Sequence, residues 1–411
     1  MYDFDALKAD FGAVAFLNSN DVGETSYLAL GAKRSLQLSE TKGAFEQLRA
    51  FYRQATLPVF GFLSYDLKND VEKLESRHPN VLAFPELCFF EPEYLFRLEG
   101  NYVTAVSGEV EMLKKYETSM RNNKEGKEEI LGHTDFSQRI SQDEYLKIFE
   151  RIQYHIHRGD IYEVNFCQEF FKEQTELIPG EVYHRLNALS IAPFSSYFAF
   201  KDYVIISASP ERFMKRTGEC VISQPIKGTI KRGNSSEEDE ALKSALKNNP
   251  KEVNENTMIV DLVRNDLSHF AKRGTVTVEE LCGIYTFKTV HQMISTVAAQ
   301  VDMKIDSTAL IKQAFPMGSM TGVPKIRAMQ LMDELESFRR GPYSGALGYI
   351  QPNGDFDMSV LIRSLFYNRA NKYLSFGVGS AITAGATAQL EYDECLLKAE
   401  ALIKSLQHKE F

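Results

Sequence analysis

The sequence predicts an α+β fold, in which antiparallel strands are joined as hairpins and helices are inserted between them in blocks. Residues 211–224 are expected to form one hairpin that turns at Thr217-Gly218. Residues 343–366 are expected to form another, because Pro352-Asn353-Gly354 is typical of a tight turn between strands. The predicted helices come in groups and do not alternate with single strands, which favours α+β over a parallel βαβ sheet.

The chain is expected to have two regions joined by a linker. Residues 1–118 are predicted to be an N-terminal β-rich subdomain, whose clearest strands, 59–65 and 93–97, are rich in aromatic residues. Residues 119–138 are predicted to be a polar linker, because charged residues crowd its middle. Residues 139–411 would then be the second and larger domain.

The second region begins with a helix and continues with longer strands. Residues 141–144 form a capping-box pattern ahead of apolar residues at helical spacing. The strand at 203–209 should end at Pro210, and residues 373–378 add a further antiparallel strand. The other predicted helices cover residues 237–247, 251–265, 281–299 and 323–335, and a C-terminal helix reaches about Leu406.

The composition is typical of a soluble protein. The 411 residues are 44% hydrophobic and 25% charged, and the net charge of -9 argues against binding to a nucleic-acid backbone. Five scattered cysteines without a Cys-x-x-Cys pair indicate a reducing compartment and no zinc or disulfide framework. No apolar run reaches membrane-spanning length, and the N-terminus is acidic where a secretion signal would be basic. We therefore expect a cytoplasmic protein that has neither a nucleic acid nor a membrane as a partner.

Two residues are candidates for catalysis. Lys227 lies in a Pro-Ile-Lys-Gly-Thr turn with no carboxylate beside it in sequence, so burial could remove its charge and leave a neutral, nucleophilic amine. The alternative is an ordinary surface lysine in a turn. Glu211 follows directly on a strand break at Pro210, a common place for a general acid or base. Its alternative is a surface ion pair with Arg212.

Two pairs of glutamates are candidate metal ligands. Glu252 and Glu255 are three residues apart on a predicted helix, and Glu391 and Glu394 repeat that spacing on the C-terminal helix. Each pair therefore points to one face of its helix. Mg²⁺ prefers a few carboxylates together with waters and substrate oxygens, so the two pairs could hold it. The alternative is two solvated helix faces.

Three further features have both a functional and a structural interpretation. His291 lies at helical spacing with apolar neighbours, where a histidine is more often a core residue than a catalyst. Residues 318–325 lead into a predicted helix and could receive a carboxylate or phosphate, although they lack the Gly-Lys-Ser/Thr of a P-loop. Arg363 lies within a predicted strand and should pair with a structural acid or a bound carboxylate.

Seven motifs follow one another along the chain. Their order identifies a protein family more specifically than any single motif does. They occupy residues 160–165, 209–213, 225–229, 255–267, 318–325, 340–346 and 391–399. As a set, they resemble the chorismate-utilising enzyme family over residues 158–402. The resemblance implies two packed antiparallel β-sheets surrounded by helices, with chorismate bound between the sheets. Residues 139–411 would then be the chorismate-binding catalytic domain.

The resemblance implies a magnesium site built from the two glutamate pairs. In the family's motifs, the glutamates that correspond to Glu255 and Glu394 ligate Mg²⁺, and those that correspond to Glu252 and Glu391 support them. The metal bridges to the ring carboxylate of chorismate and neutralises glutamates that would otherwise repel one another.

The resemblance also implies a set of substrate-binding residues. Arg363 and Tyr349 match residues that hold the enolpyruvyl carboxylate, and backbone amides at Gly379 and Ala381 assist them. Ala381 stands where the family usually has glycine, but it can still donate its amide. The other positions expected to bind substrate are Gly228, Thr229, Ser319 and Lys325.

Lys227 separates the branches of the family. In the branch that forms 4-amino-4-deoxychorismate for 4-aminobenzoate and folate synthesis, this lysine attacks C2 of chorismate, and ammonia then displaces it from C4. Glu211 matches the acid–base residue that assists departure of the 4-hydroxyl. His291 matches the histidine used for pyruvate elimination, a step that this branch leaves to another enzyme. Glu163 stands where isochorismate and salicylate synthases have a water-activating lysine, which argues against water addition.

The resemblance implies that ammonia comes from a separate glutamine amidotransferase subunit. None of the five cysteines has the Gly-x-Cys-x-Gly context of a fused glutaminase. Two alternatives stay open. The chain could form anthranilate, although relatives that do so carry alanine at the position of Lys227. It could also be a catalytically silent regulatory or binding subunit, although such a subunit would need no nucleophile there.

Overall fold

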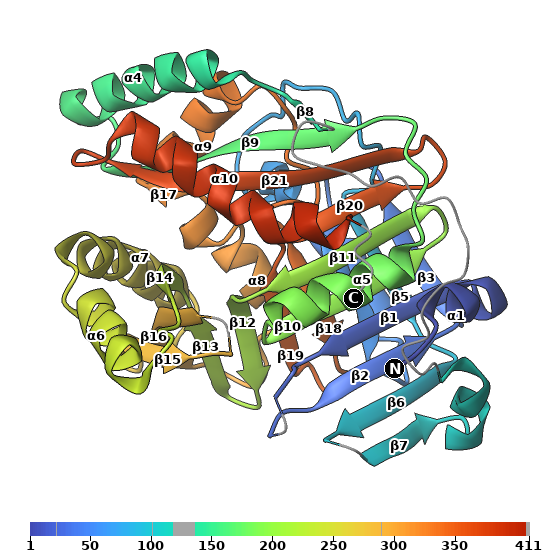
Figure 1. Cartoon of the computed structure of the whole chain (residues 1–411). Coiled ribbons are helices and arrows are strands. Elements are labelled where there is room, and N and C mark those ends of the chain that lie inside the picture. Colours follow the sequence, from blue (N-terminus) through green and yellow to red (C-terminus); the bar gives the residue numbers. More distant parts are fainter. Residues whose placement is uncertain (22, 101, 118–135, 289, 408–411) are drawn as a thin grey trace.

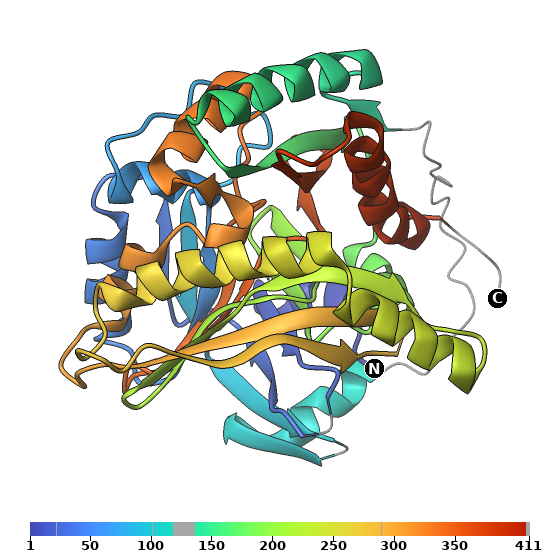
Figure 2. The same cartoon turned by 90° about the vertical axis from the view of Figure 1, so that its left-hand side faces the viewer.

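A computed structural model describes the chain except for residues 22, 101, 118–135, 289 and 408–411. Two antiparallel sheets pack against each other, and helices surround them (Figures 1 and 2). A large apolar core that draws buried residues from both sheets fills the space between them. The predicted fold class is confirmed. Most of the predicted linker 119–138 lies outside the described residues.

The first sheet has 11 strands and carries helices on its outer face. Its strands on one side come from residues after 136, and those on the other side come from the first 107 residues. In order, the strands are β17 (Gly322–Val323), β9 (Glu163–Lys172), β21 (Tyr373–Thr383), β20 (Ser364–Asn368), β11 (Tyr203–Ser209), β10 (Phe194–Phe200), β1 (Ala13–Asn18), β2 (Ser26–Leu30), β6 (Tyr94–Glu99) and β7 (Tyr102–Ser107), and β8 (Ser137–Gln138) pairs with β9.

The second sheet has 10 strands and is also assembled from both halves of the chain. Its strands are β14 (Ile226–Lys231), β16 (Val290–Gln300), β13 (Cys220–Gln224), β12 (Arg212–Thr217), β19 (Phe356–Val360), β18 (Ala346–Ile350), β4 (Val59–Leu63), β5 (Leu87–Glu91) and β3 (Arg34–Leu38), and β15 (Thr277–Thr286) pairs with β16. The hairpin predicted at 211–224 is present as β12–β13, and the one predicted at 343–366 is present over residues 346–360 as β18–β19.

Helices cover both sheets and close the ends of the molecule. Helix α10 packs on β21 and beside α4 and α5, whereas α6 and α7 lie against β14–β16 (Figure 1). Helix α4 begins with the predicted capping box at Ser141. The helices are α1 (Phe4–Phe11), α2 (Ala44–Tyr52), α3 (Lys68–Val71), α4 (Gln142–Arg158), α5 (Pro179–Ser190), α6 (Ser236–Lys247), α7 (Pro250–Ser268), α8 (Ser307–Ala314), α9 (Lys325–Leu335) and α10 (Ala388–Ser405), with short 3₁₀ turns at Tyr65–Leu67, Val110–Tyr116 and Gly318–Met320.

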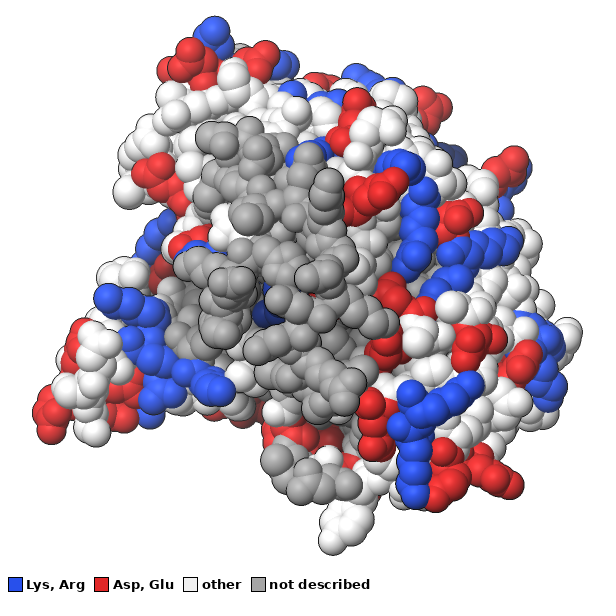
Figure 3. Space-filling view, turned by 45° about the vertical axis from the view of Figure 1, so that its right-hand side comes forward, with Lys and Arg blue, Asp and Glu red and all other residues white. Residues whose placement is uncertain are grey.

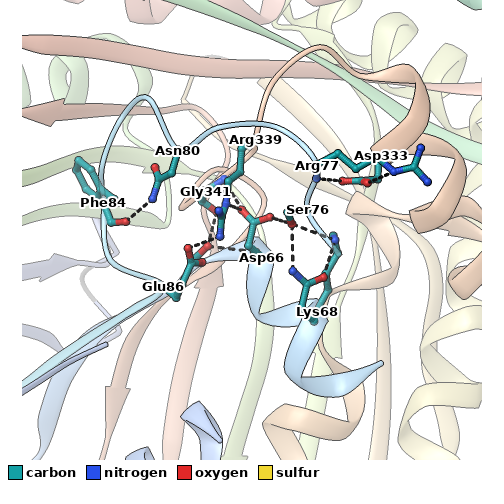
Figure 4. Close-up of polar contacts among 12 residues, drawn as sticks. Asp66, Lys68, Ser76, Arg77, Asn80, Phe84, Glu86, Asp333, Arg339 and Gly341 are labelled. Atoms are coloured by element: carbon teal, nitrogen blue, oxygen red, sulfur yellow. Dashed lines mark hydrogen bonds and ion pairs between the residues drawn. The ribbon is translucent and has the colours of Figure 1, made fainter. Parts of the chain in front are cut away.

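The N-terminal and C-terminal regions share both sheets. Strand β1 pairs with β10, and β4 pairs with β18. A buried polar cluster joins the regions a second time (Figure 4). In this cluster Asp66 accepts a hydrogen bond from the backbone N–H of Gly341 at 2.9 Å, and Arg339 donates to Glu86 at 2.6 Å. Strands from the N-terminal region therefore extend both sheets, and the two regions share one core.

The helix predicted for residues 281–299 is wrong. This segment forms the end of β15 and most of β16, which pair as a hairpin with Thr286 opposite His291. The apolar residues at helical spacing, Ile294 and Val297, are β-branched, and such side chains fit a pleated and buried strand well. Strands β13 and β14 pair with β16, and a local sequence pattern does not contain these contacts.

The second strand of the hairpin predicted at 343–366 is expected to continue to Phe366, and this is wrong beyond Val360, because the chain changes sheets there. Strand β19 ends at Val360 in the second sheet, and β20 begins at Ser364 in the first. Arg363 lies in the connection with a φ of 52°, in the left-handed region that few non-glycine residues occupy. The crossing places Arg363 between the sheets and not within one.

Two surface observations bear on possible partners. On the face drawn in Figure 3, acidic and basic side chains are interspersed. Within the described residues, no helix combines the length and the apolar character that crossing a membrane requires.

Candidate active site

Lys227 lies in β14 and is buried against Glu163, the first residue of β9. Its Nζ is 3.2 Å from Oε1 of Glu163, and the two side chains are 12% and 2% exposed. The alternative of a surface lysine is therefore excluded. The other carboxylate oxygen of Glu163, Oε2, is buried and has no hydrogen-bond partner among the described residues. The pair connects the two sheets, since β9 belongs to the first and β14 to the second.

The charge predicted for Lys227 is wrong for the protein without substrate. Burial by itself would lower the pKa of Lys227, as the sequence suggested. The carboxylates of Glu163, Glu255 and Glu211 outweigh that effect and raise the pKa, so the resting lysine is an ammonium ion. The sequence around Lys227 did not show this, because none of the three carboxylates is adjacent to Lys227 in the chain.

Glu211 lies between β11 and β12 and faces the 3₁₀ turn at Gly318–Met320. Its Oε1 accepts a hydrogen bond of 2.6 Å from the hydroxyl of Ser319. Burial raises the pKa of Glu211 to about 7, against smaller opposing effects of Ser319 and Lys227. Both residues line the same small cleft. A carboxyl group that holds its proton near neutral pH suits the role of general acid that was predicted for it.

The two glutamate pairs face each other from α7 and α10. Lys251 connects them, because its Nζ lies 2.8 Å from Oε1 of Glu391 and 3.8 Å from Oε1 of Glu255. Burial raises the pKa of Glu255 to about 7 and also raises that of Glu252. Burial has the same tendency at Glu394, but Lys398 lies 2.6 Å away and the pKa of Glu394 is lowered.

The donor set of these helices fits a hard cation such as Mg²⁺. Within the part of the chain that the structure describes, Glu255 Oε1 and Glu391 Oε2 are buried without a hydrogen-bond partner, so each has a lone pair available. Among the described residues, no three acidic, histidine or cysteine side chains converge into a complete metal site. Mg²⁺ commonly takes only one or two protein carboxylates and completes its coordination with water and substrate.

His291 is fully buried, and both of its ring nitrogens already have partners. Nε2 lies 2.9 Å from Oδ1 of Asp239, and Nδ1 lies 2.9 Å from Oγ1 of Thr286. Asp239 in turn forms an ion pair with Arg232. These contacts connect α6 to the β15–β16 hairpin. They match the structural alternative that the sequence left open, in which His291 is a core residue.

Arg363 and the end of β21 offer groups for a carboxylate. No hydrogen bond or ion pair of the Arg363 side chain occurs among the described residues, and burial lowers its pKa. Gly379 lies so close to β9 that a Cβ there would be 2.7 Å from Sγ of Cys167. Ala381 pairs with Asn165 in the same two strands. An unpaired guanidinium beside a glycine-containing strand is a suitable receptor for a carboxylate.

The other predicted substrate residues lie in varied surroundings. Gly228 has a φ of 86°, and a Cβ there would be 3.0 Å from Oε2 of Glu252, so it brings β14 close to the glutamates. Thr229 is exposed. The ring of Tyr349 packs against Tyr27 at 4.9 Å.

Lys325 is occupied by a structural partner. Its Nζ lies 2.8 Å from Asp266 and 3.0 Å from the carbonyl oxygen of Ala314. These contacts hold the first turn of α9 against α7 and α8. They leave Lys325 outside the group of side chains around Lys227.

A family model for chorismate binding enzymes matches residues 12–404. The chain belongs to this family. Anthranilate synthase component 1 of Thermus thermophilus is 31% identical over 94% of this chain and 89% of that protein. Aminodeoxychorismate synthase component 1 of Klebsiella aerogenes is 38% identical over 65% of this chain, but the match spans 59% of the relative's length. Anthranilate synthase component I of Streptococcus pneumoniae has the same fold, with a TM-score of 0.80 at 24% identity over 93% and 92% of the two chains.

Within this chorismate binding enzyme, two charged residues of the site were missed from the sequence. The sequence motifs identify Glu163 only as a position without the water-activating lysine, whereas the structure makes it the partner of Lys227. The motifs give no role to Lys251. Its position four residues before Glu255 was the available signal, since side chains at i and i+4 are neighbours on a helix.

Proposed function

We propose that this chain is component I of an aminodeoxychorismate synthase, which converts chorismate and ammonia to 4-amino-4-deoxychorismate. The observation that carries the proposal is the position of Lys227, a buried amine held by Glu163 with Glu211 and Glu255 nearby. A binding protein gains nothing from burying a lysine among carboxylates, whereas a covalent mechanism needs an amine held in place. Aminodeoxychorismate synthases among the relatives support this assignment.

In the proposed reaction the chain's own residues supply a nucleophile, a base and an acid. Glu163 accepts a proton from Lys227, whose Nζ then forms a bond to C2 of chorismate. The two ring double bonds shift, and the bond between C4 and its hydroxyl breaks as Glu211 donates the proton that lets water leave. Ammonia next forms a bond to C4, the double bonds return, and the bond between C2 and Nζ breaks.

The carboxylates of chorismate need cationic partners in this site. Arg363 is proposed to receive the enolpyruvyl carboxylate, with the backbone amides of Gly379 and Ala381. Glu255 and Glu394, supported by Glu252 and Glu391, would hold Mg²⁺, which when bound supplies positive charge for the ring carboxylate. Glu255→Gln and Glu394→Gln should therefore raise the Mg²⁺ concentration needed for half-maximal activity. Unchanged metal dependence would mean that these ligands are wrongly assigned.

Ammonia is proposed to come from a separate glutamine amidotransferase subunit. The designation "component 1" in the relatives' names supports a second component. Three of the five cysteines, Cys88, Cys167 and Cys395, are buried, and burial raises their pKa, which is unfavourable for a glutaminase nucleophile. The assembly would function in the cytoplasm.

The direct test is the identity of the product. The purified chain is incubated with chorismate, Mg²⁺ and ammonium salt at raised pH, where ammonia is abundant, and the product is identified by mass spectrometry. We expect 4-amino-4-deoxychorismate. Isochorismate would indicate water addition and would reject the proposal.

Anthranilate formation is the second candidate, because the match to the Thermus thermophilus enzyme extends over most of both chains. Anthranilate plus pyruvate as products would establish it. Two observations weigh against it. Lys227 replaces the alanine expected in that branch, and both ring nitrogens of His291, the histidine assigned to pyruvate elimination, are bonded to Asp239 and Thr286.

A further inference from the structure

Lys251 stands at the point where the two glutamate pairs meet. It is the second residue of α7, and its ammonium group reaches across to Glu391 on α10 at 2.8 Å. The same nitrogen lies 3.8 Å from Oε1 of Glu255. One positive charge on a flexible side chain thus bridges a carboxylate from each helix.

The two carboxylates and the lysine differ in how firmly they are held. Glu391 is 1% exposed and Glu255 is 8% exposed, and each keeps one buried oxygen without a hydrogen-bond partner. The Lys251 side chain is 42% exposed, and its hydrogen bond and ion pairs are to these two acids alone among the described residues. The carboxylates are therefore enclosed by the protein, whereas the lysine head group can turn into solvent.

Lys398, another lysine near the acids, is anchored in a different way. Its Nζ lies 2.6 Å from Glu394 and also donates to the carbonyl oxygen of Gly379 at 2.7 Å. Leaving Glu394 would also break a bond to the backbone of β21. Of the two cations, Lys251 is the one that can leave its carboxylate at low cost.

We propose that Lys251 is a displaceable counter-ion, which holds the glutamates of α7 and α10 together in the metal-free protein and leaves when a divalent cation binds between them. This inference rests on the metal role assigned under the proposed function. Two ionised carboxylates that lie close together repel each other and are stabilised by a cation between them. A lysine supplies one positive charge there, and a magnesium ion supplies two.

Competition between Lys251 and the metal has two measurable consequences. Removing the lysine charge should tighten Mg²⁺ binding, because the ion no longer has to displace an ammonium group. It should also destabilise the metal-free protein, because the acids then face each other without a cation. A solvent-exposed lysine that does not interact with these carboxylates would produce neither effect when it is replaced.

The test is a titration of the metal-free full chain with Mg²⁺ by isothermal calorimetry, with thermal unfolding recorded with and without the ion. For Lys251→Met we expect a Kd for Mg²⁺ that is lower by about three- to tenfold, the range expected when a partly exposed ion pair no longer competes. The metal-free melting temperature should fall by about 2 °C and should recover when Mg²⁺ is added. Lys251→Gln, which keeps a hydrogen-bond donor, should behave in the same way, and Lys251→Arg should resemble the wild type.

Lys243→Met is the matched control, because Lys243 forms a partly exposed ion pair with Glu240 on α6. Its affinity for Mg²⁺ should equal that of the wild type. An unchanged or weaker affinity in Lys251→Met and Lys251→Gln would overturn the inference, as would a wild-type protein that takes up no Mg²⁺. Tightened binding combined with anthranilate as the product would reject the amination proposal and leave the role of Lys251 supported.

Discussion

Two buried ion pairs lie at neighbouring points of strand β9, and they are bonded in opposite ways. Arg340 uses each of its nitrogens, donating to Glu336 at 2.8 Å and to the carbonyl oxygens of Met320 and Asn165 at 2.7 and 2.9 Å. Two residues before Asn165, Glu163 makes one bond to Lys227 at 3.2 Å and leaves its second oxygen without a partner.

The difference separates a structural pair from a reactive one. A buried charge whose bonds are all satisfied fixes the surrounding backbone and has no capacity left for a ligand. A buried charge with a free donor or acceptor is costly to fold, and such a cost is typical of functional sites. We therefore expect changes at Arg340 to affect stability and changes at Lys227 to affect chemistry.

The strongest test of this contrast is Lys227→Met. Because the proposed nucleophile is lost, amination should fall by about a thousandfold or more while the far-UV circular dichroism stays unchanged. Product formation from chorismate and ammonium is followed by mass spectrometry. Lys231→Met, at an exposed position of the same strand, should keep its activity. Substantial amination by Lys227→Met would reject the covalent role.

The opposite pattern is expected for Arg340→Met. Glu336 would be left buried without its cation, and two carbonyl oxygens would lose their donor, so the free energy of unfolding should fall by about 3–5 kcal/mol. Urea denaturation measures it. Arg264→Met, which breaks an exposed pair with Asp261, should change it by less than about 1 kcal/mol. Similar losses of unfolding free energy in both variants would show that the Arg340 pair contributes no more to stability than an exposed pair.

Glu211→Gln should reduce amination by about a hundredfold, since glutamine cannot donate the proton that the leaving hydroxyl needs. Burial raises the pKa of Glu211 to about 7, so the wild-type rate should decline as the pH rises above that value. The declining limb should be absent from the residual rate of the variant. A pH–rate profile measured at constant ammonia concentration distinguishes the two, and an identical profile would exclude Glu211 as the acid.

The same carboxyl group should make stability depend on pH. Its pKa is raised from 4.5 in the unfolded chain to about 7 in the folded protein, so the folded state binds the extra proton. The free energy of unfolding should therefore fall as the pH rises from 4.5 to 7, by up to about 3 kcal/mol for this group. Urea denaturation at several pH values should show a smaller decline in Glu211→Gln. Equal slopes in both proteins would contradict the raised pKa.

Features that depend on nearby residues could be predicted from the sequence. The capping box at Ser141 and the turn at Pro352-Asn353-Gly354 specify a helix start and a hairpin by local chemistry, and both are present. The spacing of the glutamates on α7 and α10 likewise placed each pair on one helix face. Their approach to each other through Lys251 depends on tertiary packing.

Features that depend on distant residues could not be predicted. Residues 281–299 form strands because β13 and β14 pair with them, and Arg363 lies between the sheets because the chain crosses there. The charge of Lys227 has the same origin, since its closest carboxylate is 64 residues away in sequence. Spacing and composition describe one segment at a time, whereas charge states follow from which segments meet.

The smallest expected effect, and the most direct view of the reactive pair, comes from Glu163→Gln. The carboxylate of Glu163 raises the pKa of Lys227, so its removal should lower that pKa while the amide still accepts a hydrogen bond from the amine. Reductive methylation of Lys227, mapped by peptide mass spectrometry across a pH series, reports the neutral fraction of the amine. The midpoint of labelling should move down by about 1–3 pH units, the range expected when one close opposite charge is removed. Amination should fall by about tenfold, because the proposed proton acceptor is lost even though more of the amine is neutral. A midpoint that stays in place would mean that Glu163 does not control the charge of Lys227, and the contrast between the two pairs on β9 would then lack its electrostatic basis.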